Sequence, residues 1–115
     1  MRIWDISPSL LCRQHLLGEH RELHAIWSVI TKKKKGYSKH PETIRWMGKL
    51  KSLYNHHQLL IKEMKKRGYK HRSNLSIKLA TGNEKQDVFI NTINEQIEIL
   101  KKKNCRCFSS LEVEG

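Results

Sequence analysis

The chain has 115 residues, enough for one domain with a modest hydrophobic core. It carries 23 lysines and arginines against 11 acidic residues, a formal net charge of +12 at pH 7. An imbalance of this size favours an anionic partner, with nucleic acid as the first candidate and an anionic membrane surface as the second. The mean hydropathy of −0.68 and the lack of a long apolar run exclude a transmembrane helix.

The amino-terminal residues and the cysteines indicate the cellular compartment of the protein. No apolar segment follows the first residues, so no secretory signal is expected. The cysteines at positions 12, 105 and 107 are an odd number without the spacing of a disulfide framework. Thiols of this kind are typical of a reducing compartment, so we expect a cytoplasmic protein, associated with the nucleoid if DNA is the anionic partner.

A first helix is predicted from about Pro8, because Ser7 is a good cap and proline is favoured at the first helical position. It is expected to reach the lysine run at 32–35 and to end at Gly36. At about 100° per residue its apolar side chains form one stripe facing the core. The stripe consists of Cys12, Leu16, Leu23, Ile26, Trp27 and Ile30.

The polar side of this helix divides into two. Gln14 and Arg21 fall opposite the apolar stripe. His15, Gly18 and Glu22 share a strip beside the stripe, where the missing side chain of Gly18 predicts a hollow.

Two further helices are predicted. One spans 41–67, interrupted near Gly48 and ended by Gly68, and the other spans 83–103. In the last helix the residues expected to face inward are Val88, Phe89, Ile93, Ile97 and Leu100. No strand pattern or internal repeat competes, so the expected fold is an all-α, compact single-domain bundle of three main helices. The domain is predicted to cover 1–103, with 104–115 as a flexible tail.

The amino terminus suggests a specific chemistry. An α-amine has a pKa of about 7.7–8.0, against about 10.4 for lysine, so part of it is an unprotonated nucleophile near neutral pH. Met1 is expected to be retained because the bulky Arg2 follows it. Glu22 would manage protons and stabilise a cationic intermediate, while Arg2 and Arg21 would hold phosphates. The alternative is that these charges are a solvated helix face behind a frayed first residue.

The remaining motifs are weighed against simpler interpretations. His20 and His24 are spaced i, i+4, but the metalloprotease pattern needs a glutamate directly after the first histidine, and Glu22 lies two residues on. We therefore predict no metal site and no cofactor. Cys105 and Cys107 lack a partner pair and are interpreted as a dithiol in a flexible tail.

The adjacent histidines at 56–57 are interpreted as a partly exposed or core-edge pair.

Basic blocks are the main surface feature. The lysine run is either a solvated helix end or a set of phosphate contacts, and the net charge favours phosphate contacts. Its members are Lys32, Lys33, Lys34 and Lys35.

Several short sequence motifs occur along the chain in a definite order and at definite spacings. They are Arg2-Ile3, then Gln14-His15-Leu16, then Arg21-Glu22-Leu23, and later Lys66-Arg67-Gly68-Tyr69. Together they resemble the pyrimidine-dimer DNA glycosylase family, which includes the phage endonuclease V. The resemblance covers the first 30 residues most clearly and residues 46–69 less closely.

The resemblance implies an all-α, metal-free DNA-repair glycosylase with lyase activity on damaged double-stranded DNA. The Met1 amine would attack C1′ of the damaged nucleotide and form a Schiff base, and Glu22 would stabilise the imino-sugar. The residues implied to bind the DNA backbone are Arg2, Gln14, His15 and Arg21. We expect a monomer that binds no membrane. The alternative is a non-catalytic basic DNA-binding module on the same scaffold.

Three departures from the family pattern are visible. Met1 stands where the family has threonine, and Ala25 stands where it has an arginine, with His24 beside it. The segment 105–110 has Phe108 as its single aromatic residue, where the phage enzyme is rich in aromatics. The chemistry is therefore better supported than the specificity for pyrimidine dimers.

Overall fold

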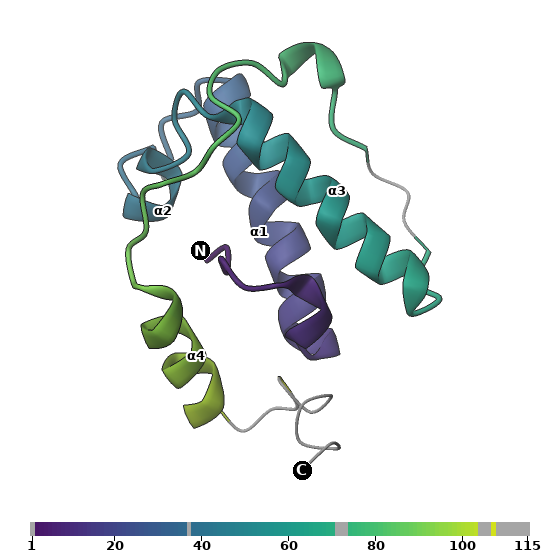
Figure 1. Ribbon diagram of the computed structural model, residues 1–115. Helices are drawn as coiled ribbons and strands as arrows, with labels where there is room; N and C mark the ends of the chain where they lie inside the picture. Colours follow the sequence, from purple (N-terminus) through teal and green to yellow (C-terminus); the bar gives the residue numbers. More distant parts are fainter. Residues whose placement is uncertain (1, 37, 71–73, 104–106, 108–115) are drawn as a thin grey trace.

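The computed structural model describes residues 2–36, 38–70, 74–103 and 107 (Figure 1). The elements in chain order are η1 (Pro8–Leu10), α1 (Arg13–Thr31), α2 (Pro41–Ile44), α3 (Leu50–Lys66), η2 (Ile77–Leu79) and α4 (Ile93–Lys102). Across the described ranges no strand forms, and the single ladder contact is an isolated bridge between Lys49 and Gly82. The all-α fold with three main helices is therefore confirmed.

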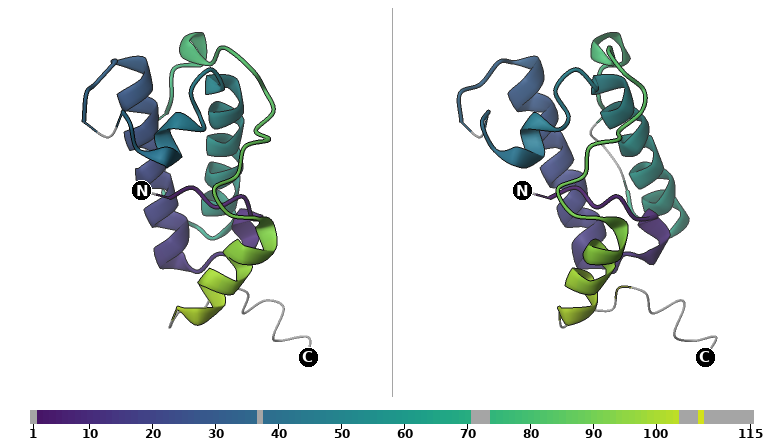
Figure 2. Two further views of the ribbon diagram at one scale, coloured as in Figure 1. Left: turned by 90° about the vertical axis from the view of Figure 1, so that its left-hand side faces the viewer. Right: turned by 60° about the vertical axis from the view of Figure 1, so that its left-hand side comes forward.

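The core lies between α1 and α3, which pack along each other (Figure 1, Figure 2). The predicted apolar stripe of α1 is confirmed, because Leu16, Leu23 and Ile26 are completely buried. Leu53 and Leu60 of α3 pack into the same core. Burying each such side chain contributes about 1.5–3 kcal/mol, so this helix pair is the main source of stability.

The predicted start of the first helix is wrong. Leu11 is extended with ψ 142°, and it separates the short helix η1 from α1. Arg67 explains the break, because its guanidinium donates hydrogen bonds to the carbonyl oxygens of Pro8 and Leu11, the latter at 2.7 Å. These carbonyls are satisfied from α3 rather than by a continuing helix, and the side chain of Leu11 is buried in the core.

The interruption near Gly48 is confirmed. Gly48 has φ +73° and separates α2 from α3, and Gly68 ends α3 with φ +85°. The backbone of Gly82 approaches Gly48 so closely that a Cβ on Gly82 would lie 2.2 Å from the Gly48 carbonyl oxygen. A hydrogen bond from the Asn83 N–H to that oxygen, at 2.9 Å, fixes the contact.

The predicted last helix begins ten residues too early in the sequence, because α4 starts at Ile93 rather than at 83. Thr92 and Glu95 form a capping box there, in which each side chain accepts a hydrogen bond from the other residue's backbone N–H. Val88 and Phe89 are 48% and 45% exposed instead of facing inward, and Ile93 is exposed too. Leu100 does face the core as predicted.

The end of the chain is described at one residue. Cys107 is 8% exposed and packs against the core, and the rest of the predicted tail 104–115 lies outside the described residues. None of the described helices is both long and apolar enough to cross a membrane.

Candidate functional site

The amino-terminal segment lies across α1, near the middle of that helix (Figure 1, Figure 2). Ile3, Trp4 and Ile6 are all buried, so the segment is part of the core. The backbone N–H of Trp4 donates a hydrogen bond to the side-chain carboxylate of Glu19 on α1. Residues 3–6 are therefore held close to the helix on which the site was predicted.

Glu19 is an unexpected buried carboxylate. It is 2% exposed, and its Oε1 also lies 3.4 Å from Nε2 of His56 on α3. Within the part of the chain that the structure describes, its Oε2 has no hydrogen-bond partner. Burial raises the pKa of Glu19, and the hydrogen bonds from His56 and Trp4 partly offset this increase.

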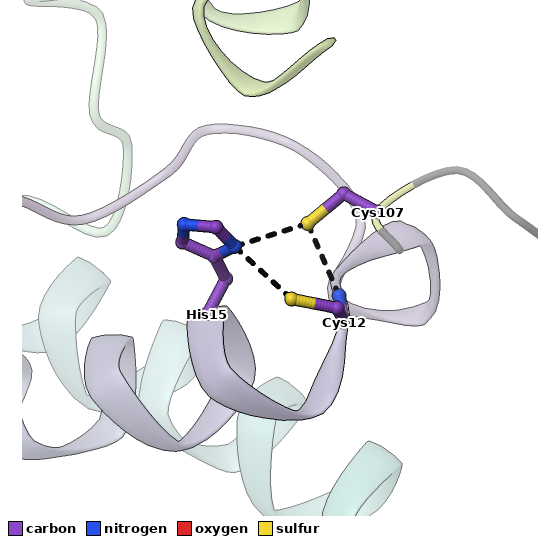
Figure 3. A group of neighbouring side chains, drawn as sticks. All are labelled: Cys12, His15 and Cys107. Carbon is purple, nitrogen blue, oxygen red and sulfur yellow. Dashed lines mark hydrogen bonds between the residues drawn. The ribbon is translucent and has the colours of Figure 1, made fainter. Parts of the chain in front are cut away.

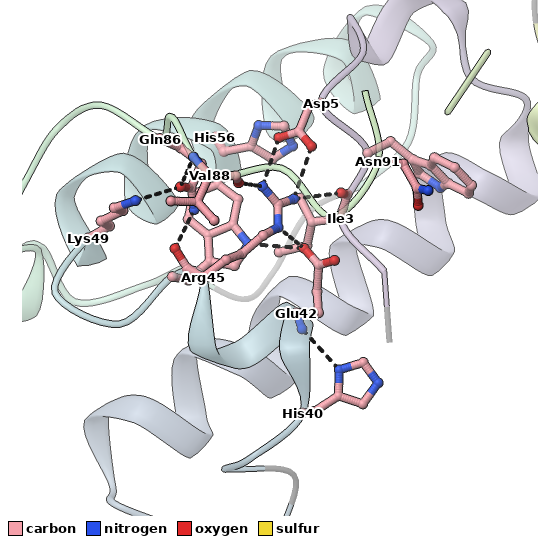
Figure 4. Close-up of polar contacts among 12 residues, drawn as sticks. Ile3, Asp5, His40, Glu42, Arg45, Lys49, His56, Gln86, Val88 and Asn91 are labelled. Carbon is pink, nitrogen blue, oxygen red and sulfur yellow. Dashed lines mark hydrogen bonds and ion pairs between the residues drawn. The ribbon is translucent and has the colours of Figure 1, made fainter. Parts of the chain in front are cut away.

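Arg45 also holds the same segment, through Ile3 and Asp5 (Figure 4). This arginine follows α2 and is 5% exposed. Its guanidinium donates to the Ile3 carbonyl oxygen at 2.9 Å and to Asp5 Oδ1 at 3.1 Å. It also donates to Glu42 Oε1 at 2.6 Å and to the Val88 carbonyl oxygen at 2.9 Å. One buried cation thus joins the chain start, α2 and the segment before α4.

Gln96 of α4 completes this arrangement. Its Oε1 accepts the Asp5 N–H at 2.8 Å, and its Nε2 donates to Asp5 Oδ2 at 3.0 Å. Residues 3–5 are therefore held by α1, by Arg45 and by α4 at once. Such fixation limits how far Arg2, the next residue toward the amino terminus, can move.

Arg2 and His15 meet on one aromatic ring. The Arg2 guanidinium carbon lies 4.6 Å from the ring centroid of Trp4. The His15 ring contacts Trp4 edge-on, with the centroids 6.1 Å apart at 88°. Two of the predicted DNA-binding residues are therefore brought together, and both are half-buried. Met1, the predicted nucleophile, lies outside the described residues.

A cluster of thiols surrounds His15 at the start of α1 (Figure 3). The Nδ1 atom of His15 lies 3.1 Å from Cys12 Sγ and 3.2 Å from Cys107 Sγ. The Cys12 backbone N–H donates to Cys107 Sγ at 3.1 Å. Burial, followed by the charge of Lys103, lowers the pKa of His15. The cluster attaches Cys107 to the beginning of α1.

The strip along α1 has the predicted form. Glu22 is half-buried, while Arg21 and Gln14 are exposed. An added Cβ on Gly18 would have Arg21 Nη2 within 4 Å, at 4.0 Å, so a small side chain has room there, while the hollow itself stays a prediction.

The lysine run is exposed at the far end of α1. Lys32 caps the helix and Lys33 adopts φ +51° in the turn that follows. The run lies about 15 Å along the helix from Glu22, at 1.5 Å per residue. It is therefore separate from the strip around Gly18 and suits contacts to more distant phosphates.

A family model of pyrimidine dimer DNA glycosylases matches residues 1–77. The chain belongs to this family. No match was found among curated proteins or among solved structures. The matched region includes α1, α2 and α3 and ends before α4.

Family membership identifies the protein as a DNA glycosylase of the repair type, with DNA as its substrate. An enzyme of this class flips the target nucleotide out of the duplex and needs a pocket beside its catalytic groups to receive it. A pocket of about 370 Å³ lies between the amino-terminal segment, Trp46 and α3. None of the predicted site residues lines it, so we do not assign the glycosylase site there.

Sequence reasoning missed three residues that position the glycosylase's amino terminus. They are Glu19, Arg45 and Gln96, which contact residues 3–5 from 15 or more positions away. Glu19 was open to prediction, because at about 100° per residue it falls beside the apolar stripe of α1. Nothing in the local sequence distinguishes Arg45 or Gln96 from surface residues.

Proposed function

We propose that this glycosylase also has lyase activity, and that the α-amine of Met1 is the nucleophile for both steps. The single observation that carries the proposal is the fixation of residues 3–5. The Glu19 carboxylate, the Arg45 guanidinium and the Gln96 amide each hold a backbone group of this segment. All three of these side chains are buried, and the segment that they hold begins two residues after Met1.

The proposed reaction begins with glycosidic bond cleavage. The unprotonated amine attacks C1′ of the damaged nucleotide, a C–N bond forms, and the bond to the base breaks with the electron pair leaving on the base. The expelled base takes up one proton from the nitrogen, whose lone pair then opens the sugar ring, and O4′ is protonated from solvent. The product is a protonated imine between Met1 and the sugar. Glu22, half-buried on α1, would stabilise the cationic imine and accept or return the proton.

The lyase step follows from the imine. Removal of a proton from C2′ allows the C3′–O bond to break, and the 3′ phosphate leaves by β-elimination. Water then hydrolyses the imine and regenerates the amine. Arg2, His15 and Arg21 are proposed to hold the flanking phosphates, and Gln14 is proposed to contact the backbone. A pyrimidine dimer is the proposed lesion, because the family model that matches the chain is that of pyrimidine dimer DNA glycosylases. With chromosomal DNA as substrate, we propose that the protein works in the cytoplasm at the nucleoid.

Borohydride trapping tests the nucleophile directly. The full chain is incubated with duplex DNA containing an abasic site or a dimer, reduced, digested and mapped by mass spectrometry. We expect a covalent adduct at Met1 and at no lysine. A chain that binds the duplex without forming any adduct would contradict the mechanism.

Glu22→Gln provides the matched variant. Glutamine keeps the size of the side chain and removes the carboxylate, so cleavage should fall by about 100-fold or more while DNA binding is retained. Unchanged cleavage would remove Glu22 from the proposed role. Blocking the α-amine by acetylation should abolish cleavage in the same assay.

The second candidate function is a DNA-binding module without chemistry. The exposed lysine run, which lies away from Glu22, is the observation that favours it. This candidate predicts salt-sensitive binding and no strand cleavage on any lesion. The trapping experiment therefore separates the two candidates in one measurement.

A further inference from the structure

Three histidine nitrogens converge between α1 and α3, on side chains to which the proposed chemistry gives no part. The Nε2 atoms of His20 and His24 lie 3.2 Å apart. The Nε2 atom of His57, from α3, is 3.2 Å from that of His20 and 3.0 Å from that of His24. We propose that this cluster, the histidine triad, binds a divalent transition-metal ion, with zinc as the ion of best fit.

The spacing of the triad is that of metal ligands. Zinc–nitrogen bonds of about 2.0–2.1 Å in a tetrahedron place the ligand nitrogens about 3.3–3.4 Å apart. The three observed separations are close to this value, and each joins the same type of atom. An ion at the centre would bond to all three nitrogens at once.

Hydrogen bonds alone do not account for the triangle. The Nε2 of a neutral imidazole carries either one hydrogen or one lone pair, and never both. Among three such atoms in mutual contact, at least two present the same group to each other. One of the three contacts is therefore repulsive in every combination of tautomers. A cation removes this conflict, because all three nitrogens then direct lone pairs at it.

The tautomer of His57 is set for metal binding. Its Nδ1 lies 3.1 Å from the Oε1 of Gln58, an oxygen that can only accept a hydrogen bond. Nδ1 therefore carries the hydrogen in the neutral ring, and Nε2 presents its lone pair to the triad. Histidine ligands of metals characteristically donate their other ring N–H to an oxygen in this way.

The scaffold of the triad is rigid. His20 and His24 are one helical turn apart on α1, so their side chains lie on the same face. His57 is completely buried, and its ring stacks on that of His20 with centroids 5.1 Å apart. The site therefore joins the two helices that form the core. Three histidines also leave one coordination position for water.

The proposed ion lies away from the Schiff-base chemistry. Two residues along a helix correspond to a rotation of about 200°, so Glu22 is directed away from both His20 and His24. The ion is therefore assigned to holding α1 against α3. Its presence is independent of whether Met1 acts as a nucleophile.

The thiol cluster around His15 is the competing location for a metal. The side chains of Cys12, His15 and Cys107 also lie within reach of one ion. A thiol can rotate its hydrogen and also accept hydrogen bonds, so the two sulfur–nitrogen contacts are compatible with ordinary hydrogen bonding. In the histidine triad no choice of tautomers satisfies all three contacts, so we assign the metal site to the triad.

Zinc binding to the full chain tests the proposal. Chelator-treated protein is titrated with Zn²⁺ alone, and bound metal is measured after desalting, with about one ion per chain expected at the triad. His24→Gln removes one ligand at a half-buried position and should weaken zinc affinity by about 100-fold or more. His56→Gln is the matched control, because its imidazole faces Glu19 and its loss should leave zinc affinity unchanged.

Cobalt distinguishes the two clusters. Co²⁺ bound by imidazoles gives visible d–d bands without the near-ultraviolet charge-transfer band of a cobalt–sulfur bond. We expect this spectrum in the wild type and in a Cys12→Ser, Cys107→Ser variant, and its loss in His24→Gln. Far-ultraviolet circular dichroism checks that each variant is folded, with His20→Asn as a second ligand variant.

Two results would overturn the assignment. One is a folded wild-type chain that retains no zinc and shows no cobalt d–d bands. The other is metal binding that survives both ligand variants and disappears with the two cysteines. Neither result depends on DNA cleavage, so the metal site and the proposed catalytic function are tested separately.

Discussion

The Trp4 backbone N–H donates to a Glu19 carboxylate that is almost completely buried, and this bond fixes the amino-terminal segment on α1. A buried carboxylate is unfavourable in itself, and burial accordingly raises the pKa of Glu19. Its retention at this position is explained by the groups that it holds, the chain start on one side and His56 on the other. Glu19 therefore positions the amino-terminal segment on α1.

Glu19→Ala should destabilise the protein and reduce cleavage together. The substitution leaves the Trp4 N–H buried without an acceptor, which costs about 1–3 kcal/mol. Glu19→Gln keeps an acceptor oxygen of the same shape and should stay close to the wild type in stability. Urea unfolding and cleavage of an abasic duplex measure the two effects. Equal stability of the alanine and glutamine variants would contradict this role.

Arg45→Met should be among the most destabilising substitutions. It removes the cation that pairs with Asp5 and Glu42, which lie 3.1 Å and 2.6 Å from the guanidinium. Breaking a buried pair by removing one partner costs about 3–5 kcal/mol, because the remaining charges are left uncompensated. Thermal and denaturant unfolding measure the loss.

Arg45→Lys is the control for this prediction. Lysine keeps the charge but cannot reproduce the fork that reaches Ile3, Asp5 and Glu42 together. Its stability should fall between those of the wild type and the methionine variant. A lysine variant as stable as the wild type would show that charge alone is sufficient.

Local patterns were sufficient for part of this fold. The period of apolar residues identified Leu16 and Leu23 as core, and the glycine at position 48 marked the break between α2 and α3. The capping box at Thr92 is equally local, a threonine followed three residues later by glutamate, and it was overlooked in favour of a longer helix.

Long-range contacts account for what the sequence could not reveal. The extended backbone at Leu11 depends on Arg67, 56 residues away. The anchoring of Ile3 depends on Arg45, 42 residues away, and no local pattern reports such a pair. The same holds for the histidine triad, where two members share a helix and the third comes from α3. The family strings pointed to Arg2 and Glu22, but not to the side chains that hold residues 3–5.

Neutralising the lysine run should change DNA binding without changing the chemical step. Replacing lysines 32–35 by glutamine removes four exposed charges at the end of α1. Each lost phosphate contact lowers the log–log slope of affinity against salt by about 0.9. Fluorescence anisotropy over a salt series measures the slope, and single-turnover cleavage at saturating protein should be unaltered. An unchanged slope would mean that the run is only a solvated helix end.

The capping box at the start of α4 should contribute less to stability in acid, because Glu95 becomes protonated. Its carboxylate accepts the Thr92 backbone N–H at 2.9 Å, and this bond lowers the pKa of Glu95 below its ordinary value of 4.5. A depressed pKa in the folded state means that the contribution is fully present above pH 4.5. It is lost as the pH falls through the lower folded pKa, where the carboxylate takes up its proton.

Glu95→Gln separates the charge from the hydrogen bond. Glutamine still accepts from the Thr92 N–H, so the helix start is retained while this acid-dependent contribution disappears. Thr92→Ala should instead cost about 1 kcal/mol at every pH, because it removes the cap itself. Urea unfolding at a series of pH values between neutral and acidic measures both variants. A glutamine variant that follows the wild-type pH profile would show that other carboxylates govern the acid response.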